Sequence, residues 1–525
     1  MNKNVQRETE NVQRAMCNVQ RFVFDIYSTM RQTRRTQSTI RLLCTLLVAL
    51  CTVSINVQGQ NVFSLEDVIH RAQTQSPAFK QAETRRENSY WLFQQYRTNY
   101  VPQIRANSNN GGALYNNSFS RTPQPDGTFK YQPVNYLNPG VNFSLQQPIE
   151  WTGGTISVNS SYNYFRDLKN LQPTIWNGSP FYINLFQPIF SFNPLKWARM
   201  TEPIRFEESK RGYTEAMEAI ARDGVTSFFN VLQAQVNLQI AKFNLANNDT
   251  IYKIEQGRYN IGTTSEDKLL QVELQLLRSR QDVARANLDL QNASLNLRTY
   301  IGLRNGEGFS LVMPDQIPAF DVSEEEAITY AKQTRAAFVA FERRKIEAEQ
   351  AVAQAKGQRY NVGVTAAYGT NNTAPNFSEV YQNTSKQRIA SITFDVPLVD
   401  WGRRRATMRT AYANKQLTDY QIAQDEVVFE QEILTQVRQF EMLRLSIDIT
   451  RKADEVAQNR YMVAQNRYLI GKIDITNLNI ALTEKDAAKR SYIDALKQFW
   501  TAYYELRRLT LYDFSAGRLL YSANP

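Results

Sequence analysis

The same five-residue turn occurs twice in this 525-residue chain. Residues 258–262 read Arg-Tyr-Asn-Ile-Gly, and residues 467–471 read Arg-Tyr-Leu-Ile-Gly. Each copy lies between two of the longest helical patterns in the sequence. Because self-similarity at this scale indicates a duplicated supersecondary unit, we predict that the chain folds as two related halves.

The similarity between the halves extends beyond the turns. Ser64–Asp67 followed by Ala72 is matched by Ser323–Glu326 followed by Ala331. Each half reads as a helix, then strands, a very long helix, a turn and a long helix. We predict a first repeat over 60–320, with strands over about 101–190 and a helical hairpin over about 204–303, and a second repeat over 321–525, with strands over about 358–398 and a hairpin over about 404–514.

The first 59 residues have the features of an export signal. Several arginines precede the apolar run Leu42–Val53, which is too short to span a bilayer, and Val57–Gly59 has the small-x-small pattern of a signal-peptidase site. We therefore expect an upstream extension and signal peptide over 1–59, with synthesis starting at Met30 and the mature chain at Gln60. All three cysteines fall in this segment, so we expect a mature chain without disulfides.

The long helical patterns do not fit a compact globule. From Ile204 to Asn260 there is no proline, and apolar residues recur at intervals of three, four and seven, as in coiled coils. The segment from about 404 to 467 has the same pattern. At ~1.5 Å per residue, each such helix reaches roughly 80 Å. Charged residues occupy much of the remaining surface, so we expect these helices to lie in water.

Between the helices the apolar period changes to two. Apolar and polar residues alternate in Val141–Gln146 and Ile156–Tyr164, and again in Val362–Tyr368 and Ser391–Val396. Segments of about ten residues with one apolar side are typical of transmembrane β-barrels, although a soluble β-sandwich alternates in the same way. The export signal and the absence of a long apolar helix favour the barrel. Because open sheet edges are not tolerated in hydrocarbon, several copies of the chain must close it together.

Other functional classes find little support. The net charge of +11 is spread over helices and interleaved with acidic residues, so no basic face for nucleic acid is predicted. The single histidine, His70, lies on a helical pattern, and we find no metal-ligand spacing, phosphate-binding glycine loop or serine elbow. We therefore predict neither catalysis nor a cofactor or metal. The remaining alternative is a secreted or periplasmic coiled-coil scaffold without a channel, which leaves the amphipathic strands unexplained.

Taken together, these features resemble the TolC-like outer membrane efflux proteins. The resemblance covers essentially the whole mature chain and rests on the Ser64–Val68 opening, the Gln147–Ile149 and Val396–Leu398 segments, Trp401–Arg404 and the two Arg-Tyr-x-x-Gly turns. It implies a homotrimer in the cell outer membrane, with an α-helical barrel that continues a shared β-barrel and extends into the periplasm. It also implies a passive exit duct for efflux or type I secretion, which works with a periplasmic adaptor and an inner-membrane transporter.

The resemblance also identifies candidate site residues. The two turns correspond to the periplasmic tip, where the adaptor docks; the glycines suit the left-handed backbone of a helical reversal. Asp474 and Asn477 are candidates for a gate, although Asn477 and Ile480 stand where some members carry rings of aspartates. Three copies of Asp474 form a smaller acidic ring in this hypothesis, but its position better fits a helix start, where an aspartate is favoured by the helix dipole. The predicted adaptor contacts are Arg258, Tyr259, Gly262, Thr263, Arg467, Tyr468, Gly471 and Lys472.

The number of strands departs from simpler members of the family. The first half offers two alternating pairs, at about 103–148 and 155–188, where one pair is usual. The barrel then has either six strands per chain instead of four, or an extra pair that forms an appendage. The long polar connections, which we expect to be extracellular loops, are 116–139, 166–180 and 371–386.

Overall fold

The structure is a computed structural model that describes residues 61–108, 114–169, 173–303, 309–314, 317–358 and 360–521. The chain divides into two units, Met1–Asn61 and Val62–Pro525. The predicted upstream extension and signal peptide, with all three cysteines, lie outside the described residues. The second unit contains the helices and the large sheet described below.

The helices repeat the same lengths in both halves. The helices of each half have 11, 22, 67 and 36 residues in chain order, and a β-sheet segment interrupts each series before the longest helix. A helix of 67 residues is about 100 Å long. The internal repeat predicted from the turns is therefore present in the architecture. These helices are α3 (Leu65–Gln75), α4 (Pro77–Thr98), α5 (Pro194–Asn260) and α6 (Glu266–Ile301), and α7 (Glu324–Thr334), α8 (Ala336–Gly357), α9 (Arg403–Leu469) and α10 (Ile475–Thr510).

Local sequence signals explain where most of these helices begin. The Ser64 hydroxyl accepts a hydrogen bond from the Asp67 amide, and the Asp67 carboxylate accepts one from the Ser64 amide, which forms a capping box at the start of α3. Ser76 caps α4 in the same way through the Phe79 amide, ahead of a proline in the first turn. His70 lies on the exposed side of α3.

Two predicted helix boundaries are wrong. Helix α5 begins at Pro194 rather than at about 204, because the Asn193 side chain caps it by accepting hydrogen bonds from the backbone amides of Leu195 and Lys196. Pro203 is accommodated inside the helix. At the other end of the chain, α10 stops at Thr510 rather than at about 514. Leu511 adopts a left-handed backbone, φ 45°, which cannot continue a helix.

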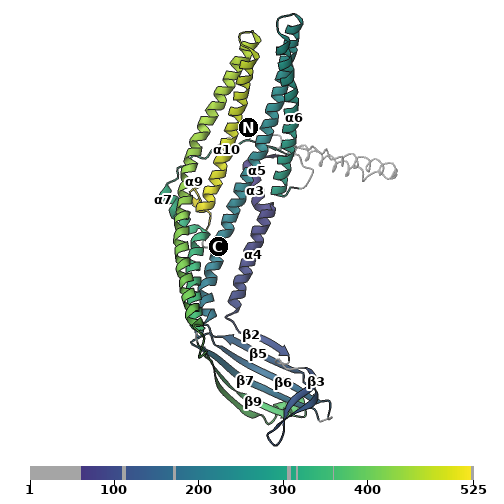
Figure 1. Ribbon diagram of the computed structural model, residues 1–525, viewed down its shortest axis with the longest axis vertical. Coiled ribbons are helices and arrows are strands. Elements are labelled where there is room, and N and C mark those ends of the chain that lie inside the picture. Colours follow the sequence, from purple (N-terminus) through teal and green to yellow (C-terminus); the bar gives the residue numbers. More distant parts are fainter. Residues whose placement is uncertain are drawn as a thin grey trace, which may run out of the picture. The chain divides into compact units, whose positions relative to one another are not determined.

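The helices lie side by side in a fixed order. In the half of the unit nearer the two turns, α5 packs against α6 and α10, and α10 packs against α9. In the half nearer the sheet, α5 packs against α4 and α8, and α8 packs against α9 (Figure 1). Each half of the chain therefore contributes one long helix with two shorter helices stacked along it. Helices α4 and α6 lie at one edge of this layer, and α9 lies at the other.

The main core lies where the two halves of the chain meet. Its largest fully buried side chains include Phe228 and Phe229 from α5, Leu297 from α6, Ile433 from α9 and Phe499 from α10. Burying an aromatic or aliphatic side chain of this size contributes about 1.5–3 kcal/mol. A smaller cluster around Ile251, Tyr461 and Leu478 packs the hairpins together closer to their turns. The hairpins are thus held together by apolar contacts at two levels.

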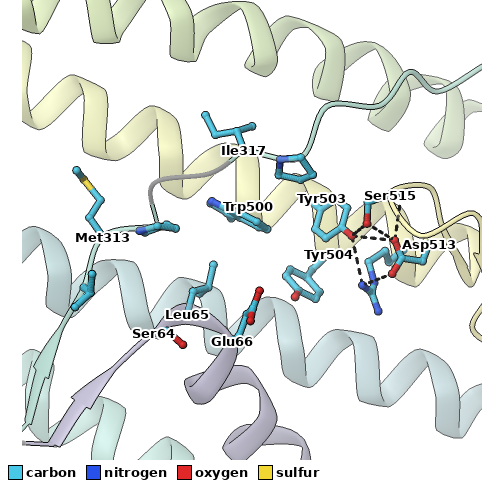
Figure 2. Close-up of a pocket in the computed structure, with 14 residues that line it drawn as sticks. Ser64, Leu65, Glu66, Met313, Ile317, Trp500, Tyr503, Tyr504, Asp513 and Ser515 are labelled. Atoms are coloured by element: carbon cyan, nitrogen blue, oxygen red, sulfur yellow. Dashed lines mark hydrogen bonds and ion pairs between the residues drawn. The ribbon is translucent and has the colours of Figure 1, made fainter. Parts of the chain in front are cut away.

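A buried ionic network joins the halves beside this core. Arg507 on α10 donates two hydrogen bonds to the Glu218 carboxylate on α5, at 2.8 and 3.2 Å, and one to Asp513, at 2.9 Å. Tyr503 also donates to Asp513, at 3.0 Å. Because one unpaired charge at such depth costs several kcal/mol, the bonded partners fix the relative position of α5 and α10. A cavity of about 700 Å³ adjoins the network and is lined by Trp500, Tyr504 and the start of α3 (Figure 2).

The large sheet is antiparallel throughout. Its continuous path runs β10-β9-β7-β6-β5-β2, so the first half contributes four strands to this path and the second half two. A further hairpin, β3–β4, is attached only where β4 meets the end of β6. The strands are β2 (Gln103–Ser108), β3 (Tyr115–Pro123), β4 (Phe129–Leu137), β5 (Gly140–Pro148), β6 (Thr155–Asp167), β7 (Ile175–Ile189), β9 (Asn361–Ala374) and β10 (Ser385–Asp395).

The predicted long loops are partly wrong. Most of 116–139 forms the β3–β4 hairpin, in which Asn116 donates to the Tyr136 hydroxyl at 3.1 Å and Arg121 stacks over the Phe129 ring across the two strands. Asp126 with Gly127, φ 82°, supplies a tight turn. The segment 166–180 is shortened because β7 begins at Ile175. Within 371–386, β9 continues to Ala374 and a short helix, η3 (Phe377–Tyr381), follows.

Smaller elements complete the described part of the chain. Strand β1 (Asn61–Phe63) pairs with β8 (Phe309–Leu311), and β11 (Tyr512–Asp513) pairs with β12 (Arg518–Leu519). Across the described ranges, every helix is either too short or too polar to cross a bilayer.

Candidate functional site

One face of the large sheet exposes apolar side chains. Ile104, Leu145, Val158, Ile183 and Tyr368 are successive cross-strand partners on β2, β5, β6, β7 and β9, and residues directly opposite one another share a face. Four of these five are exposed, with Leu145 at 42%. The alternation predicted from the sequence therefore forms one continuous apolar surface across the strands.

The opposite face is polar and better covered. Its corresponding row consists of Arg105, Ser144, Asn159, Tyr182 and Gly369. Ser144 is only 2% exposed, and Asn159 is also buried. A sheet of a water-soluble protein buries its apolar face and exposes its polar face. This sheet has the reverse arrangement, which is typical of strands with lipid outside and water inside.

Packing on the apolar face is confined to one end of the sheet. There, Val380 and Phe377 of η3 pack against Tyr162 and Trp176, and the Tyr162 and Tyr381 hydroxyls are 2.6 Å apart. The rows nearer the helices keep their exposed apolar side chains. A β-sandwich needs a second layer over this face, so the exposure argues against the soluble-sandwich interpretation.

Both repeated turns have the same hydrogen-bonded geometry. Gly262 and Gly471 adopt left-handed backbones with φ 73° and 75°, as predicted for a helical reversal. The amide of Thr263 donates to the Arg258 carbonyl at 2.9 Å, and that of Lys472 donates to the Arg467 carbonyl at 2.9 Å. These are Schellman motifs, in which the residue after the glycine bonds back across the last helical turn. A Cβ atom added at either glycine would have no atom within 4 Å apart from those of its chain neighbours.

The two copies of the turn differ in how their tyrosines are placed. Tyr259 is 41% exposed, whereas its counterpart Tyr468 is only 3% exposed. Arg258 is half-buried beside Tyr468, with its guanidinium 5.6 Å from the centre of the ring. The remaining predicted contact residues, Gly262, Thr263, Arg467, Gly471 and Lys472, are exposed. The predicted set therefore separates into an outward group and the inward pair Arg258 and Tyr468.

A residue that sequence reasoning missed joins the two turns. Glu255 on α5 is 5% exposed, and its Oε1 accepts hydrogen bonds from Tyr468 Oη and Arg258 Nη1, both at 2.7 Å. Burial alone would raise the pKa of Glu255, but hydrogen bonds from Tyr468, Arg258 and Thr264 outweigh burial and hold that pKa below its usual value. Its signal in the sequence is only a carboxylate three positions before Arg258. The matching residue in the other half, Ala464, has no such group.

The gate candidates take part in capping a helix. Asp474 is the N-cap of α10, and its Oδ1 accepts from the Asn477 amide at 3.0 Å and from the Asn477 side chain at 2.7 Å. Both residues are exposed, as is Ile480. These bonds give Asp474 and Asn477 a role in starting the helix. Their role in a gate stays a prediction.

The chemistry of the described residues offers little for catalysis. No group of three or more His, Cys, Asp or Glu side chains suited to a metal ion occurs within the described ranges. Of the three charged residues that line the 700 Å³ cavity, Arg507 and Asp513 are bonded to each other, and Glu66 lies on the exposed first turn of α3. The arrangement separates a sheet with an exposed apolar face from helices with a polar surface.

Comparison with known proteins identifies the class of protein. The model of the outer membrane efflux protein family matches residues 155–303 and 328–510, more than half of the chain. The chain belongs to this family, and its location is the cell outer membrane. No curated protein sequence matches it significantly.

Solved outer membrane channels share the fold at low sequence identity. The Campylobacter jejuni CmeC outer membrane channel is 15% identical, with a TM-score of 0.61 and 85% of each chain covered. The Vibrio cholerae outer membrane protein VceC is 14% identical, with a TM-score of 0.58 and coverage of 85% of this chain and 95% of that one. The open state of the Neisseria gonorrhoeae MtrE outer membrane channel is 14% identical, with a TM-score of 0.58 and coverage of 87% and 91%.

The hydrogen bonds that join the two turns through Glu255 predict how the distance between the turns changes when one of these bonds is lost. Tyr468→Phe removes one hydrogen bond to the Glu255 carboxylate, worth about 1.5–3 kcal/mol net because the acceptor is charged, so the distance between the turns should become more variable. Because the folded-state pKa of Glu255 is lowered, the link is intact above the ordinary glutamate pKa of about 4.3 and is lost as pH falls through the lower folded-state value. Spin labels attached to the cysteines of a Thr263→Cys, Lys472→Cys variant measure this distance by double electron–electron resonance.

The matched control is Tyr259→Phe, which changes the exposed tyrosine of the other turn and should leave the distances unchanged. Glu255→Gln should give broad distances that no longer depend on pH. Identical distance distributions for the unchanged chain and Tyr468→Phe, at neutral and acid pH alike, would contradict the link.

Proposed function

We propose that this protein is the exit duct of a tripartite efflux or type I secretion system. In this role it passively conducts substrate from a periplasmic adaptor and an inner-membrane transporter to the outside. The observation that carries the proposal is the large sheet, whose apolar face is exposed and whose strands lead directly into helical hairpins about 100 Å long. The sequence contains no phosphate-binding glycine loop, and we assign the energy source to the transporter.

A homotrimer is supported by an apolar stripe along α6. The stripe faces away from the buried residues Val272 and Leu276, which pack toward α5. Its side chains are separated by four, three, eleven and seven residues, which are coiled-coil intervals. Exposing such an apolar stripe to water, on a helix at the edge of the layer, is unfavourable in free energy and marks an interaction surface. It consists of the exposed residues Leu270, Leu274, Leu277, Leu288 and Leu295.

A matching stripe runs along α9 at the opposite edge of the layer. Its residues, separated by three, four, seven and seven, are the exposed Met442, Leu445, Ile449, Val456 and Val463. The two stripes correspond in position. Leu270 and Val463 each lie eight residues from their turn glycine, Leu277 and Val456 fifteen, and Leu288 and Leu445 twenty-six.

This correspondence supports packing between neighbouring copies. Helix α6 runs away from its turn and α9 runs toward its turn, and both turns lie at the end of the helices far from the sheet (Figure 1). An α6 and an α9 from two copies therefore meet antiparallel with their leucines and valines at the same levels. In the proposed trimer, three such seams close the helical barrel in water.

The outward residues of the turns form the proposed adaptor-docking site. Gly262 and Gly471 lie at the extreme of each hairpin with open space around them, and Tyr259, Thr263, Arg467 and Lys472 are exposed beside them. Arg258 and Tyr468 support this surface from inside through Glu255. In three copies, Asp474 would also present an acidic ring near the tip; we retain it, with Asn477, as a proposed gate that selects cations.

The scaffold alternative explains less of the structure. A coiled-coil scaffold without a channel accounts for the helices and for the stripes on α6 and α9. It gives no reason for a sheet that exposes its apolar face and covers Ser144 and Asn159. We therefore favour the duct.

The docking assignment predicts that Gly262→Arg combined with Gly471→Arg abolishes transport while trimers remain in the outer membrane. The two arginines place bulk at the tip and also strain the left-handed turns by about 1–2 kcal/mol each. The matched control is Gly262→Asn with Gly471→Asn, because asparagine tolerates this backbone and adds little bulk. Efflux of a toxic compound, measured with trimer content on native gels, tests the pair. Full transport by the arginine variant refutes the docking assignment.

The seam predicts that Leu274→Glu with Leu277→Glu prevents trimer formation. Both side chains are exposed in a single copy, so the helices should still fold, but two carboxylates would be buried at each seam without partners. Size-exclusion chromatography with light scattering in detergent measures the assembly, and circular dichroism measures helix content.

The matched control adds the same two charges to other exposed positions of α6, Gln271→Glu with Asn287→Glu, and should remain trimeric. A stable trimer of the leucine variant, with unchanged helix content, would remove α6 from the interface.

A further inference from the structure

The six strands of the main sheet leave two unpaired edges. Strand β10 pairs with β9 over eleven residues, and β2 pairs with β5 over six, and neither has a second partner strand within the described residues. All described side chains of β10 except Gln387 are exposed. An open row of backbone N–H and C=O groups is a template for pairing, and hydrocarbon does not tolerate it.

We propose that β10 of one copy pairs antiparallel with β2 of the next copy, so that every copy contributes six strands to the barrel. This inference rests on the proposed trimer, and three copies of the six-stranded path then close a barrel of 18 strands. It decides between the two arrangements that the sequence left open. The appendage is the β3–β4 hairpin, not a pair of barrel strands.

Strand direction supports this closure. Along the path β2, β5, β6, β7, β9 and β10, each strand is antiparallel to its neighbour. An even number of alternating strands gives β2 and β10 opposite directions. The β10 of one copy therefore meets the β2 of the next with the same antiparallel geometry as every pair within the copy, and the alternation continues around the barrel.

The two edges also agree in which face is apolar. Ile104 on β2 lies in the exposed apolar row, and the equivalent side of β10 carries the exposed Ile392 and Phe394 in the part nearer the helices. Farther from the helices this side carries Arg388, which is paired with Tyr368 and has its guanidinium 6.0 Å from the centre of that ring. The other side carries Arg105 on β2 and Ser391 and Thr393 on β10. Pairing of the two edges thus brings the apolar residues of the helix-proximal parts of both strands to one side, and Arg105, Ser391 and Thr393 to the other.

A barrel of four strands per copy would require existing pairs to be broken. In that arrangement β10 would pair with β6 of the next copy, but the available edge of β6 is already occupied by β5 over nine residue pairs, Gly140–Pro148 with Thr155–Asn163. In contrast, β4 touches β6 through only Tyr136 and Leu137. The contacts therefore identify β2 and β5 as members of the barrel wall.

The wider barrel has a consequence for selectivity. Barrel diameter grows roughly linearly with strand number, and barrels of 16–18 strands leave an aqueous channel. With 18 strands, the sheet region is a wide, Ser- and Asn-lined passage, and the narrowest part of the duct lies at the helical tips instead. Cargo size is then limited at the turns joined by Glu255 and Tyr468.

Disulfide cross-linking between copies tests the closure. The described residues contain no cysteine. Arg105→Cys on β2 is combined in turn with Gln387→Cys, Ile389→Cys, Ser391→Cys and Thr393→Cys, which lie on the same face of β10. Directly opposite side chains are about 4.5–5.5 Å apart at Cβ, within reach of a disulfide. At least one combination should give covalent dimers and trimers on non-reducing gels of outer membranes.

A parallel series with Ser157→Cys on β6 is the discriminating control and should give no covalent oligomers. Cross-links in the Ser157 series and none in the Arg105 series would overturn the six-strand closure in favour of four. Trimers on native gels without cross-links in either series would overturn it too, while leaving the proposed trimer standing. An absence of trimers for the unmodified chain would instead overturn the proposed function.

If the cysteine variants fail to assemble, a cryo-electron microscopy map of the unmodified protein gives the same answer. A cross-section of the sheet region with 18 strands supports the inference, and one with 12 strands overturns it.

Discussion

Backbone N–H and C=O groups left unpaired in hydrocarbon cost several kcal/mol each, and this cost governs the rest of the architecture. The large sheet exposes an apolar surface that belongs in lipid, yet β2 and β10 each leave one edge that no other described strand of the same copy pairs with. Lipid exposure on one face and open edges on both sides are compatible only if the edges are closed. The proposed closure by further copies would pair the backbone groups of both edges.

The helical part has a different physical constraint, the exposure of apolar side chains to water, which association between copies would also relieve. In water, the costly features are the leucine and valine stripes on α6 and α9, which no helix among the described residues covers. Equal helix lengths in the two halves place corresponding stripe residues at the same distance from their turns. In the proposed trimer, this would bring the stripes of neighbouring copies to the same levels. Within a copy, the Arg507–Glu218 pair and the Phe228–Phe499 core hold the halves together, so that association between copies can act on a defined edge.

Much of this organisation was predictable because it depends on local pattern. The alternation around Phe143 and Leu145, the glycines of the two turns and the Ser64 capping box are each determined within a few residues. The helix start at Pro194 was not predictable, because a capping asparagine and a tolerated Pro203 outweighed the usual meaning of proline. The polar composition of 116–139 predicts a loop, because the aromatic residues of the β3–β4 hairpin face polar residues, proline or leucine across the strands and give no regular apolar alternation.

The features that sequence could not give are those that require knowledge of partners. Tyr259 and Tyr468 occupy equivalent places in the repeat, yet only Tyr468 finds a buried carboxylate, which comes from a helix of the other half. Strand number depended on register: β5 joins β6 along nine pairs, whereas β4 joins it along two. Neither fact leaves a distinctive pattern along the chain.

The central claim is that the exposed apolar face of the sheet is turned toward lipid. Spin labels placed singly at Leu145, Ile183 and Tyr368, and at Ser144, Asn159 and Tyr182, measure it most directly by their accessibility to oxygen and to a water-soluble nickel chelate in a bilayer. The account predicts high oxygen accessibility in the first set and high chelate accessibility in the second. Equal accessibility of both sets to the chelate would contradict it.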